Sequence, residues 1–259
     1  MLTGQLEYLI TQELKKRGDG YGIVVDISGK ILSKEGVVKS SGISINGLLN
    51  PTSINENVPQ IHIHDGAVIN TPNRCAVYGA GYGNWTFDDG CKVTGSEALS
   101  IKSGNWIING GTFTATGEYN LPAPANGDGT EPTGAAVSIT HNTGYKGEVE
   151  VTINDGTFTS VSQSALFEGQ NTNTNSMSAL SDKGITINGG TFTTRNNTLY
   201  PIHIMNLLNK PVNVKTGNKI QLYPNFNLSA ANWTKTDDGD NLILTLYDNI
   251  ENLECINLT

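Results

Sequence analysis

The chain has 259 residues, of which 15% are charged, and its formal net charge is −8. With only three arginines, it lacks the basic stripe that a protein binding duplex DNA or RNA needs. Its three cysteines, Cys75, Cys91 and Cys255, are scattered and odd in number, which excludes a disulfide framework and the ligand spacing of a zinc finger.

The first segment of the chain, residues 3–17, has the pattern of an amphipathic helix. Thr3 can cap its start, aliphatic side chains fall on one face, and basic residues lie at its end. We predict that this helix caps the open edge of the domain that follows, with an attachment or trimerisation segment as the alternative. Residues 21–27 and 30–33 are predicted strands, and residues 34–60 form a connector.

A ten-residue phrase is repeated along the middle of the chain, in three close copies and two looser ones. The copies are IHIHDGAVIN at 61–70, WTFDDGCKVT at 85–94, WIINGGTFTA at 106–115, VTINDGTFTS at 151–160 and ITINGGTFTT at 185–194. Each copy combines alternating strand residues, a glycine-containing turn and a second short strand. The spacing starts in the low twenties and lengthens where loops are inserted, which is typical of a solenoid of stacked repeats.

Alignment of the copies places residues of like polarity in columns, as stacked strands with one buried face require. One inward column is apolar throughout: Ile61, Trp85, Trp106, Val151 and Ile185. One outward column is polar: His64, Asp88, Asn109, Asn154 and Asn188. A third column contains Val68, Lys92, Phe113, Phe158 and Phe192. Lys92 interrupts it, and Val93 is the alternative inward residue there. The two tryptophans are predicted to be core residues rather than a sugar-binding platform.

The sequence I-N-G-G-T-F-T in these copies resembles the right-handed β-helix repeats of pectate-lyase-like proteins, which include bacterial surface proteins and bacteriophage tail spikes and fibres. The resemblance covers roughly residues 60–205 and implies a fold but no single activity, because that architecture carries lyases, hydrolases, adhesins and inert spacers alike. We therefore predict an all-β protein whose centre, residues 61–205, is a right-handed parallel β-helix of about five coils. Residues 1–60 are the predicted N-terminal segment with the capping helix, and residues 206–259 a C-terminal β cap or oligomerisation segment.

Two long polar insertions leave the repeat, at residues 117–134 and 168–183. Loops of this length inside a compact domain are commonly functional, so we expect them to project from the stack and to contact a partner. In the C-terminal segment, residues 233–247 have the pattern of a β-hairpin around Asp237-Asp238-Gly239.

Asp88 and Asp89 are the candidate catalytic residues, because β-helix hydrolases cleave glycans with paired carboxylates. However, Asp89 occupies the turn position that Gly110 and Gly189 occupy in other copies. We therefore favour a turn-forming role for this aspartate. A polysaccharide hydrolase or lyase is the less favoured alternative.

His62 and His64 are candidate metal ligands. They lie two positions apart and so share the outward face, and Asp88 is predicted one repeat further on. Two imidazoles and a carboxylate can bind a transition metal. We favour a solvated outer face instead, because no third nitrogen or sulfur ligand is predicted nearby, and no cofactor is predicted. The candidate sugar-stacking residues are the loop tyrosines Tyr82, Tyr119 and Tyr145.

These observations favour a non-enzymatic structural and adhesive protein of a bacteriophage virion. It would be a head or tail fibre or spike whose loops bind a host-surface glycan or protein. The alternatives are a glycan-cleaving tail spike and a bacterial surface adhesin. Residues 1–10 lack the basic region of a signal peptide, and no apolar run is long enough to span a membrane. This favours a virion protein assembled in the host cytoplasm over a protein of the bacterial surface or a secreted one.

The predicted partners follow from the same reasoning. The resemblance to phage spikes implies a homotrimer, and the N-terminal region is expected to dock to a capsid or tail protein. A nucleic acid partner is not expected, because the chain is acidic.

Overall fold

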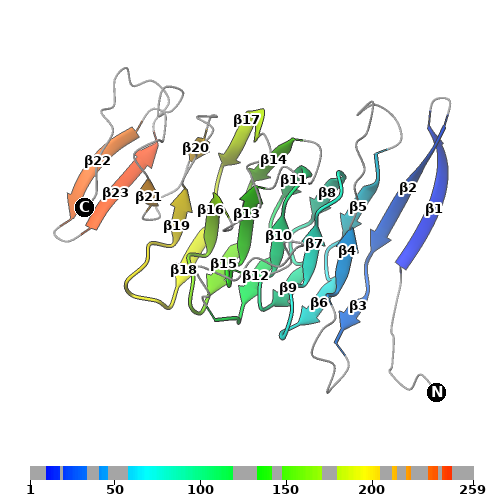
Figure 1. Cartoon of the computed structure of the whole chain (residues 1–259), viewed down its shortest axis with the longest axis horizontal. Coiled ribbons are helices and arrows are strands. Elements are labelled where there is room, and N and C mark those ends of the chain that lie inside the picture. The colour runs from blue at the N-terminus through cyan, green and yellow to red at the C-terminus, as the bar shows by residue number, and fades with distance from the viewer. Residues whose placement is uncertain are drawn as a thin grey trace.

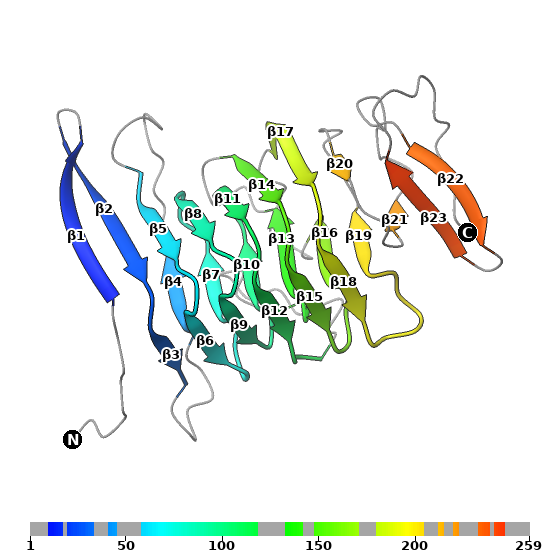
Figure 2. The same ribbon diagram turned by 180° about the vertical axis from the view of Figure 1, so that it is seen from behind.

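A computed structural model describes residues 10–17, 20–33, 41–45, 58–118, 133–141, 148–170, 180–204, 212–214, 220–222, 233–238 and 241–246. Within these ranges every regular element is a β-strand and there is no helix, so the prediction of an all-β protein is confirmed. Most strands lie in three parallel sheets, as in a parallel β-helix, and Figures 1 and 2 show these sheets from opposite sides.

The strands of the first sheet are, in spatial order, β1 (Ile10–Arg17), β2 (Gly20–Ile27), β5 (Gln60–Ile63), β8 (Asn84–Phe87), β11 (Gly104–Ile108), β14 (Val149–Ile153), β17 (Leu180–Ile187) and β20 (Val212–Val214). The strands of the second sheet are β3 (Lys30–Leu32), β6 (Val68–Thr71), β9 (Lys92–Gly95), β12 (Thr112–Ala115), β15 (Thr157–Ser160) and β18 (Thr191–Thr194). The strands of the third sheet are β4 (Ile43–Ile45), β7 (Val77–Gly79), β10 (Leu99–Ile101), β13 (Val137–His141), β16 (Leu166–Gln170), β19 (Ile202–Ile204) and β21 (Ile220–Leu222).

The chain visits the three sheets one after another. Strands β5, β6 and β7 each add to a different sheet, and β8, β9 and β10 then pair with them in parallel. The pairing register places Ile61 beside Trp85 and Trp85 beside Trp106, as the predicted inward column requires. Strands β2, β3 and β4 precede this series and already occupy the same three sheets.

Stacked aromatic side chains fill much of the interior. The rings of Trp85 and Trp106 are parallel within 9°, with centroids 4.4 Å apart. Phe158 lies between Phe113 and Phe192, at 5.0 and 4.6 Å from their centroids. All five side chains are buried, which confirms that the tryptophans belong to the core. Stacking of aromatic rings adds to the free energy gained from burying them.

The third predicted column is shifted by one residue in the first two copies. Phe113 pairs with Val93 and Val93 with Ile69, so Lys92 faces outward, as the alternative assignment proposed. The cause is the length of the turn: four residues separate Ile63 from Val68, whereas three separate Ile108 from Thr112. The additional residue in the copy at 85–94 is Gly90, with a φ of 82°, and the buried Cys91 after it lies beside Gly111, which has a φ of 102°. A Cβ atom at Gly111 would lie 2.6 Å from the Cys91 Sγ atom, so this position requires glycine.

The predicted N-terminal helix is wrong. Residues Ile10–Arg17 form β1, which pairs antiparallel with β2 and brings Arg17 opposite Gly20. Residues 3–9 lie outside the described part. The physical reason is the exposed edge of β2: a strand placed there satisfies its backbone groups, whereas a fifteen-residue helix is only marginally stable without packing.

The later segments agree with their predicted strands. The hairpin at 233–247 is present as β22 (Trp233–Asp238) and β23 (Asn241–Leu246), which pair antiparallel. The insertion predicted at 168–183 is shorter than expected, because β16 extends to Gln170 and β17 begins at Leu180. Of the insertion at 117–134, only residues 117–118 and 133–134 are described.

Candidate functional site

Three neighbouring strands of the first sheet bring four ionisable side chains together on its outer face. Asp26 of β2 pairs in register with His62 of β5. His64 follows β5 directly, and its backbone N–H donates to the Ile27 carbonyl over 2.8 Å. Asp88 follows β8, and its N–H donates to the Ile63 carbonyl over 2.9 Å. Regular strand pairing therefore fixes the backbone at each of these positions.

The two histidines point outward because their neighbours point inward. Ile61 and Ile63 are buried in the core, and successive strand residues face opposite sides of a sheet. The imidazole rings of His62 and His64 lie against each other, with centroids 3.7 Å apart and planes tilted by 39°. Each ring turns one nitrogen toward Asp26 and the other toward Asp88.

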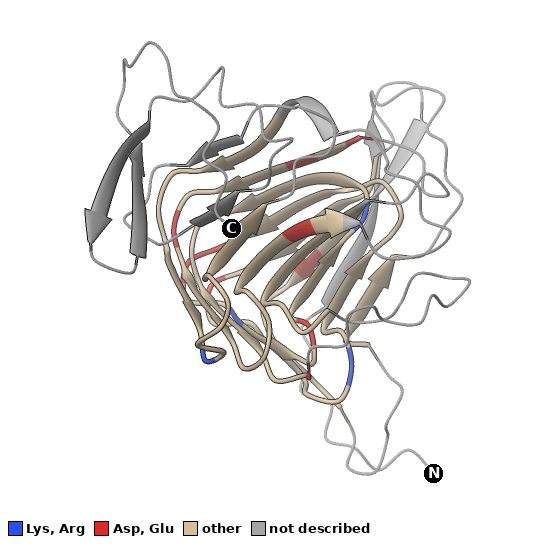
Figure 3. Ribbon diagram, turned by 60° about the vertical axis from the view of Figure 1, so that its left-hand side comes forward, with Lys and Arg blue, Asp and Glu red and all other residues tan. Residues whose placement is uncertain are grey.

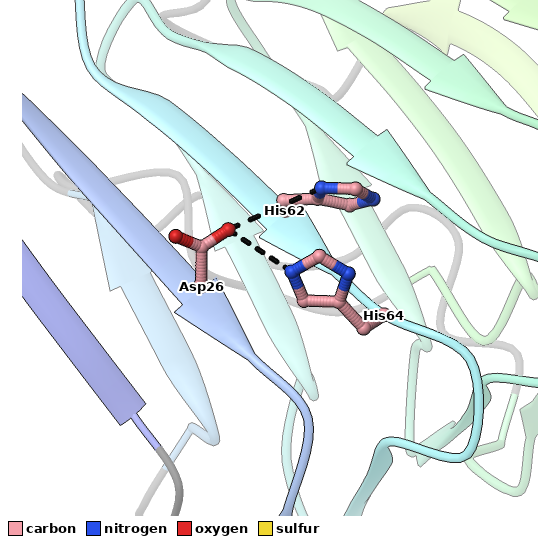
Figure 4. Close-up of side chains that lie close together, drawn as sticks. All are labelled: Asp26, His62 and His64. Atoms are coloured by element: carbon pink, nitrogen blue, oxygen red, sulfur yellow. Dashed lines mark hydrogen bonds and ion pairs between the residues drawn. The ribbon is translucent and has the colours of Figure 1, made fainter.

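On the Asp26 side, the carboxylate oxygen Oδ1 contacts both rings. It lies 3.0 Å from His64 Nε2, at hydrogen-bond distance, and 4.0 Å from His62 Nδ1. Figure 4 shows the rings of His62 on β5 and of His64 just after it beside the Asp26 carboxylate from β2. The structure thus adds a second carboxylate to the set predicted from the sequence.

On the Asp88 side, the contacts use the other nitrogen of each ring. Asp88 Oδ2 lies 2.8 Å from His62 Nε2 and 3.4 Å from His64 Nδ1. His62 Nε2 is shielded from solvent and makes no aligned hydrogen bond despite this short distance. Asp88 therefore lies next to His62 and His64, as the column alignment predicted.

The cluster is accessible but not fully exposed. The side chains of His62 and His64 are each 35% exposed, that of Asp26 is 36% exposed and that of Asp88 31%. Asp26, His62 and His64 each offer one donor atom, and these atoms lie within 4.8 Å of one another. Two imidazole nitrogens and a carboxylate oxygen form a ligand set suited to transition metals.

Asp26 was missed because the sequence reading began the stack at residue 61. The segment containing Asp26 alternates Val25, Asp26, Ile27 before Ser28-Gly29, which matches the alternation of β5 before its own turn. Alignment of these two segments would have placed Asp26 opposite His62.

Asp89, the other candidate catalytic residue, stands at a turn. It is exposed, and its Oδ1 atom accepts a hydrogen bond of 2.9 Å from the backbone N–H of Gly90. Asp155 does the same with Gly156 over 2.8 Å. This hydrogen bond gives Asp89 the turn-forming contact that the repeat alignment predicted.

The candidate tyrosines present no open ring in the described residues. Tyr82 is only 5% exposed, whereas an exposed ring was expected. Burial raises the pKa of its phenol, and a hydrogen bond with Asn105 acts in the opposite direction. Tyr119 and Tyr145 lie outside the described residues.

A second polar cluster is buried beside the third sheet and was not predicted. Glu97 Oε2 accepts hydrogen bonds from the backbone N–H and the hydroxyl of Thr133, over 2.6 and 2.7 Å. Lys102 Nζ donates to the Thr140 hydroxyl over 2.5 Å. Burial raises the pKa of Glu97, and nearby Ser100, Lys102 and Thr133 partly offset that rise. The repeat pattern does not predict this cluster, because the cluster depends on where the chain rejoins the stack after an insertion.

No family model, curated protein or solved structure matches this chain. In Figure 3 the blue segments that mark Lys and Arg are few and set apart, so the described ribbon carries no basic stripe. Among the described residues there is also no helix long and apolar enough to cross a membrane.

Proposed function

We propose that the chain is a non-enzymatic structural and adhesive protein, a head or tail fibre or spike of a bacteriophage virion. The proposed architecture is a right-handed parallel β-helix of about five coils that assembles as a homotrimer. In this proposal the N-terminal region docks to a capsid or tail protein, and the loops bind a host-surface glycan or protein. The virion setting rests on the similarity of the I-N-G-G-T-F-T copies to repeats of phage spikes and fibres.

The observation that carries the proposal is the anchoring of the insertion between β12 and β13. At its start, the Gly117 N–H donates to the Ser96 carbonyl over 3.1 Å, and Ser162 Oγ donates to the Gly117 carbonyl over 2.6 Å. Neighbouring repeats on both sides therefore hold the chain where it leaves the stack.

The other end of this insertion is held in the same way. Glu97 accepts both hydrogen bonds from Thr133, and Ser160 Oγ donates to the Gly134 carbonyl over 2.6 Å. Glu97 and Ser160 are buried, so these bonds are shielded from water. A loop with both ends fixed on a rigid stack can change its sequence without disturbing the core, which suits a surface that must match varying receptors.

Loop replacement tests the adhesive role. Residues 119–132 are replaced by a short Gly-Ser linker, and the full chain is applied to an array of bacterial capsule and lipopolysaccharide glycans and to whole bacterial cells. We expect the wild type to bind and the variant to lose binding while its unfolding temperature stays unchanged. A second variant replaces residues 171–179, within the other predicted insertion, and a third replaces both segments. Unchanged binding by variants with either or both loops replaced would contradict the proposal.

The same glycans test the enzymatic alternative. If the wild type releases new reducing ends and Asp88→Asn or Asp89→Asn abolishes the release, the protein is a glycan-cleaving spike.

The gene neighbourhood distinguishes a virion protein from a bacterial surface adhesin. Capsid and tail genes nearby would support a virion protein, whereas export genes would support an adhesin. Deletion of residues 1–33 tests docking, because particles that still incorporate the truncated chain would exclude that role.

A further inference from the structure

We propose that Asp26, His62 and His64 bind a divalent transition-metal ion, with Asp88 as the outer partner of the two histidines. This inference is independent of the proposed virion function. It rests on the relative positions of four side chains that three adjacent strands hold in place.

The distances between donor atoms suit a shared ion. Ligand atoms placed about 2.0–2.2 Å from a transition metal lie roughly 3–4 Å from one another. Asp26 Oδ1 lies 3.0 Å from His64 Nε2 and 4.0 Å from His62 Nδ1. An ion at this position needs only small side-chain rotations, because the backbone of each ligand is fixed by the sheet.

Asp88 completes the arrangement from the opposite side. A histidine that binds a metal through one nitrogen commonly directs its other N–H to a carboxylate, which fixes the ring and makes it a stronger ligand. Asp88 Oδ2 lies 2.8 Å from His62 Nε2 and 3.4 Å from His64 Nδ1, the two nitrogens that face away from Asp26. The Asp88 carboxylate can thus orient both proposed ligands, and His62 Nε2, which makes no aligned hydrogen bond, would donate to it.

The donor types select the class of ion. Imidazole nitrogens suit Zn²⁺, Cu²⁺, Ni²⁺ and Fe²⁺, whereas Ca²⁺ and Mg²⁺ prefer sites built from oxygen atoms. The partial exposure of all four side chains leaves room for water to complete the coordination shell.

The bound ion would connect strands that are distant in sequence. Asp26 belongs to β2, whereas His62 belongs to β5 and His64 follows it directly. A long segment separates β2 from β5 along the chain. An ion shared by both strands holds β2 against the stack at the N-terminal side of the first sheet. Because the ion binds its ligands on both strands only while the strands are paired, its binding free energy is expected to slow local opening of β2.

Metal titration tests the site directly. Untagged full-length protein is treated with EDTA, dialysed, and titrated calorimetrically with ZnCl₂ and, separately, with NiCl₂, CaCl₂ and MgCl₂. We expect one Zn²⁺ per chain, weaker but measurable Ni²⁺ binding, and no heat from Ca²⁺ or Mg²⁺. Equal binding of Ca²⁺ and Zn²⁺, or no Zn²⁺ binding, would overturn the proposal.

Three variants assign the ion to these residues. The double variant His62→Gln/His64→Gln should abolish Zn²⁺ binding, and Asp88→Asn should weaken it about 10- to 100-fold. Asp65→Asn is the matched control, since it removes the same charge from an exposed neighbour outside the cluster and should leave the affinity unchanged. Undiminished binding by the double variant would contradict the assignment, provided that its circular dichroism spectrum matches the wild type.

Hydrogen exchange tests the connection between strands. With Zn²⁺, amides of Gly20–Ile27 and Gln60–Ile63 should exchange more slowly in the wild type and at an unchanged rate in the double variant. Identical exchange with and without Zn²⁺ in a protein shown to bind it would exclude the role in holding β2.

Discussion

One outward column of the first sheet carries two kinds of chemistry along its length. At 109, 154 and 188 it consists of asparagines, and each side-chain amide bonds the next: Asn154 to Asn109 and Asn188 to Asn154, both over 2.9 Å. At 64 and 88 the same column consists of a histidine and an aspartate, joined by Asp26 and His62. At all five positions the backbone N–H donates to the carbonyl of the last residue of the preceding strand in the sheet. Residue type therefore decides whether the side chains of the column bond to one another or remain available as ligands.

The contrast shows how a repeat acquires a site. An asparagine carries both a donor and an acceptor, so a stack of identical residues is complete at every step. A carboxylate accepts only, and a neutral imidazole has one donor and one acceptor, so the mixed cluster retains capacity for a cation. Replacing asparagines by histidine and aspartate at one end of this outward column therefore leaves the buried core unchanged.

The largest expected effect comes from the core that both regions share. Phe158→Ala removes the central ring of a buried stack beneath the asparagine region and should lower the free energy of unfolding by about 3–5 kcal/mol. Urea unfolding measures the loss. If the two regions are locally independent, the variant should retain the Zn²⁺ affinity of the wild type under native conditions, and a parallel loss of affinity would show that they are coupled.

A buried histidine on the third sheet should have the next largest effect, through pH. Burial lowers the pKa of His203 to about 4, below its ordinary value of 6.5. Its contribution to stability is therefore present above pH 6.5 and lost as the pH falls toward 4, by on the order of 3 kcal/mol. Unfolding midpoints measured between pH 7 and 4 should fall less steeply for His203→Gln. An equal slope in both proteins would place the acid sensitivity elsewhere.

A smaller effect is expected within the asparagine region itself. Asn154→Ala removes two hydrogen bonds between side-chain amides on the exposed face and should lower the free energy of unfolding by about 1–2 kcal/mol. Thr152→Ala, on the same face of β14 but outside the asparagine column, is the control and should cost less. Chemical denaturation compares them. Equal losses would show that the column adds nothing beyond strand propensity.

The smallest effect is expected at the cysteine beneath the mixed region. Burial, with the carboxylates of Asp88, Asp89 and Asp65 as lesser causes, raises the pKa of the Cys91 thiol to about 12. The native protein should therefore leave Cys91 unmodified by iodoacetamide at pH 8, while the unfolded chain reacts. Peptide mass spectrometry gives the extent of modification, and rapid labelling in the native state would show that this turn opens.

Much of the fold could be predicted from the sequence because each copy of the repeat tests the alignment of the others. Inward residues such as Trp106 had to align with apolar residues in every copy, and they do. The exceptions are local. Lys92 was misplaced because the turn before it is one residue longer, and a shift of one residue exchanges the faces of a strand. Residues 10–17 were assigned to a helix from the spacing of their apolar residues. That spacing gives no information about the free edge of β2, with which these residues pair.

The site could be predicted only in part, because one of its residues lies outside the recognisable copies. His62, His64 and Asp88 lie in recognisable copies, whereas Asp26 lies in a segment whose similarity to them is limited to alternation. The contact between Glu97 and Thr133 joins residues on either side of an insertion, and a sequence does not indicate where such a chain returns.

The direction of β1 has a consequence for assembly. A parallel stack with a bare end is a template on which another chain can continue the winding, and filaments grow that way. At the end of the first sheet shown on the right of Figure 1, the outermost strand β1 runs against its neighbour β2. A second chain that arrives there does not meet the parallel edge that would extend the winding. Continuation of the first sheet by parallel pairing at this end is therefore disfavoured.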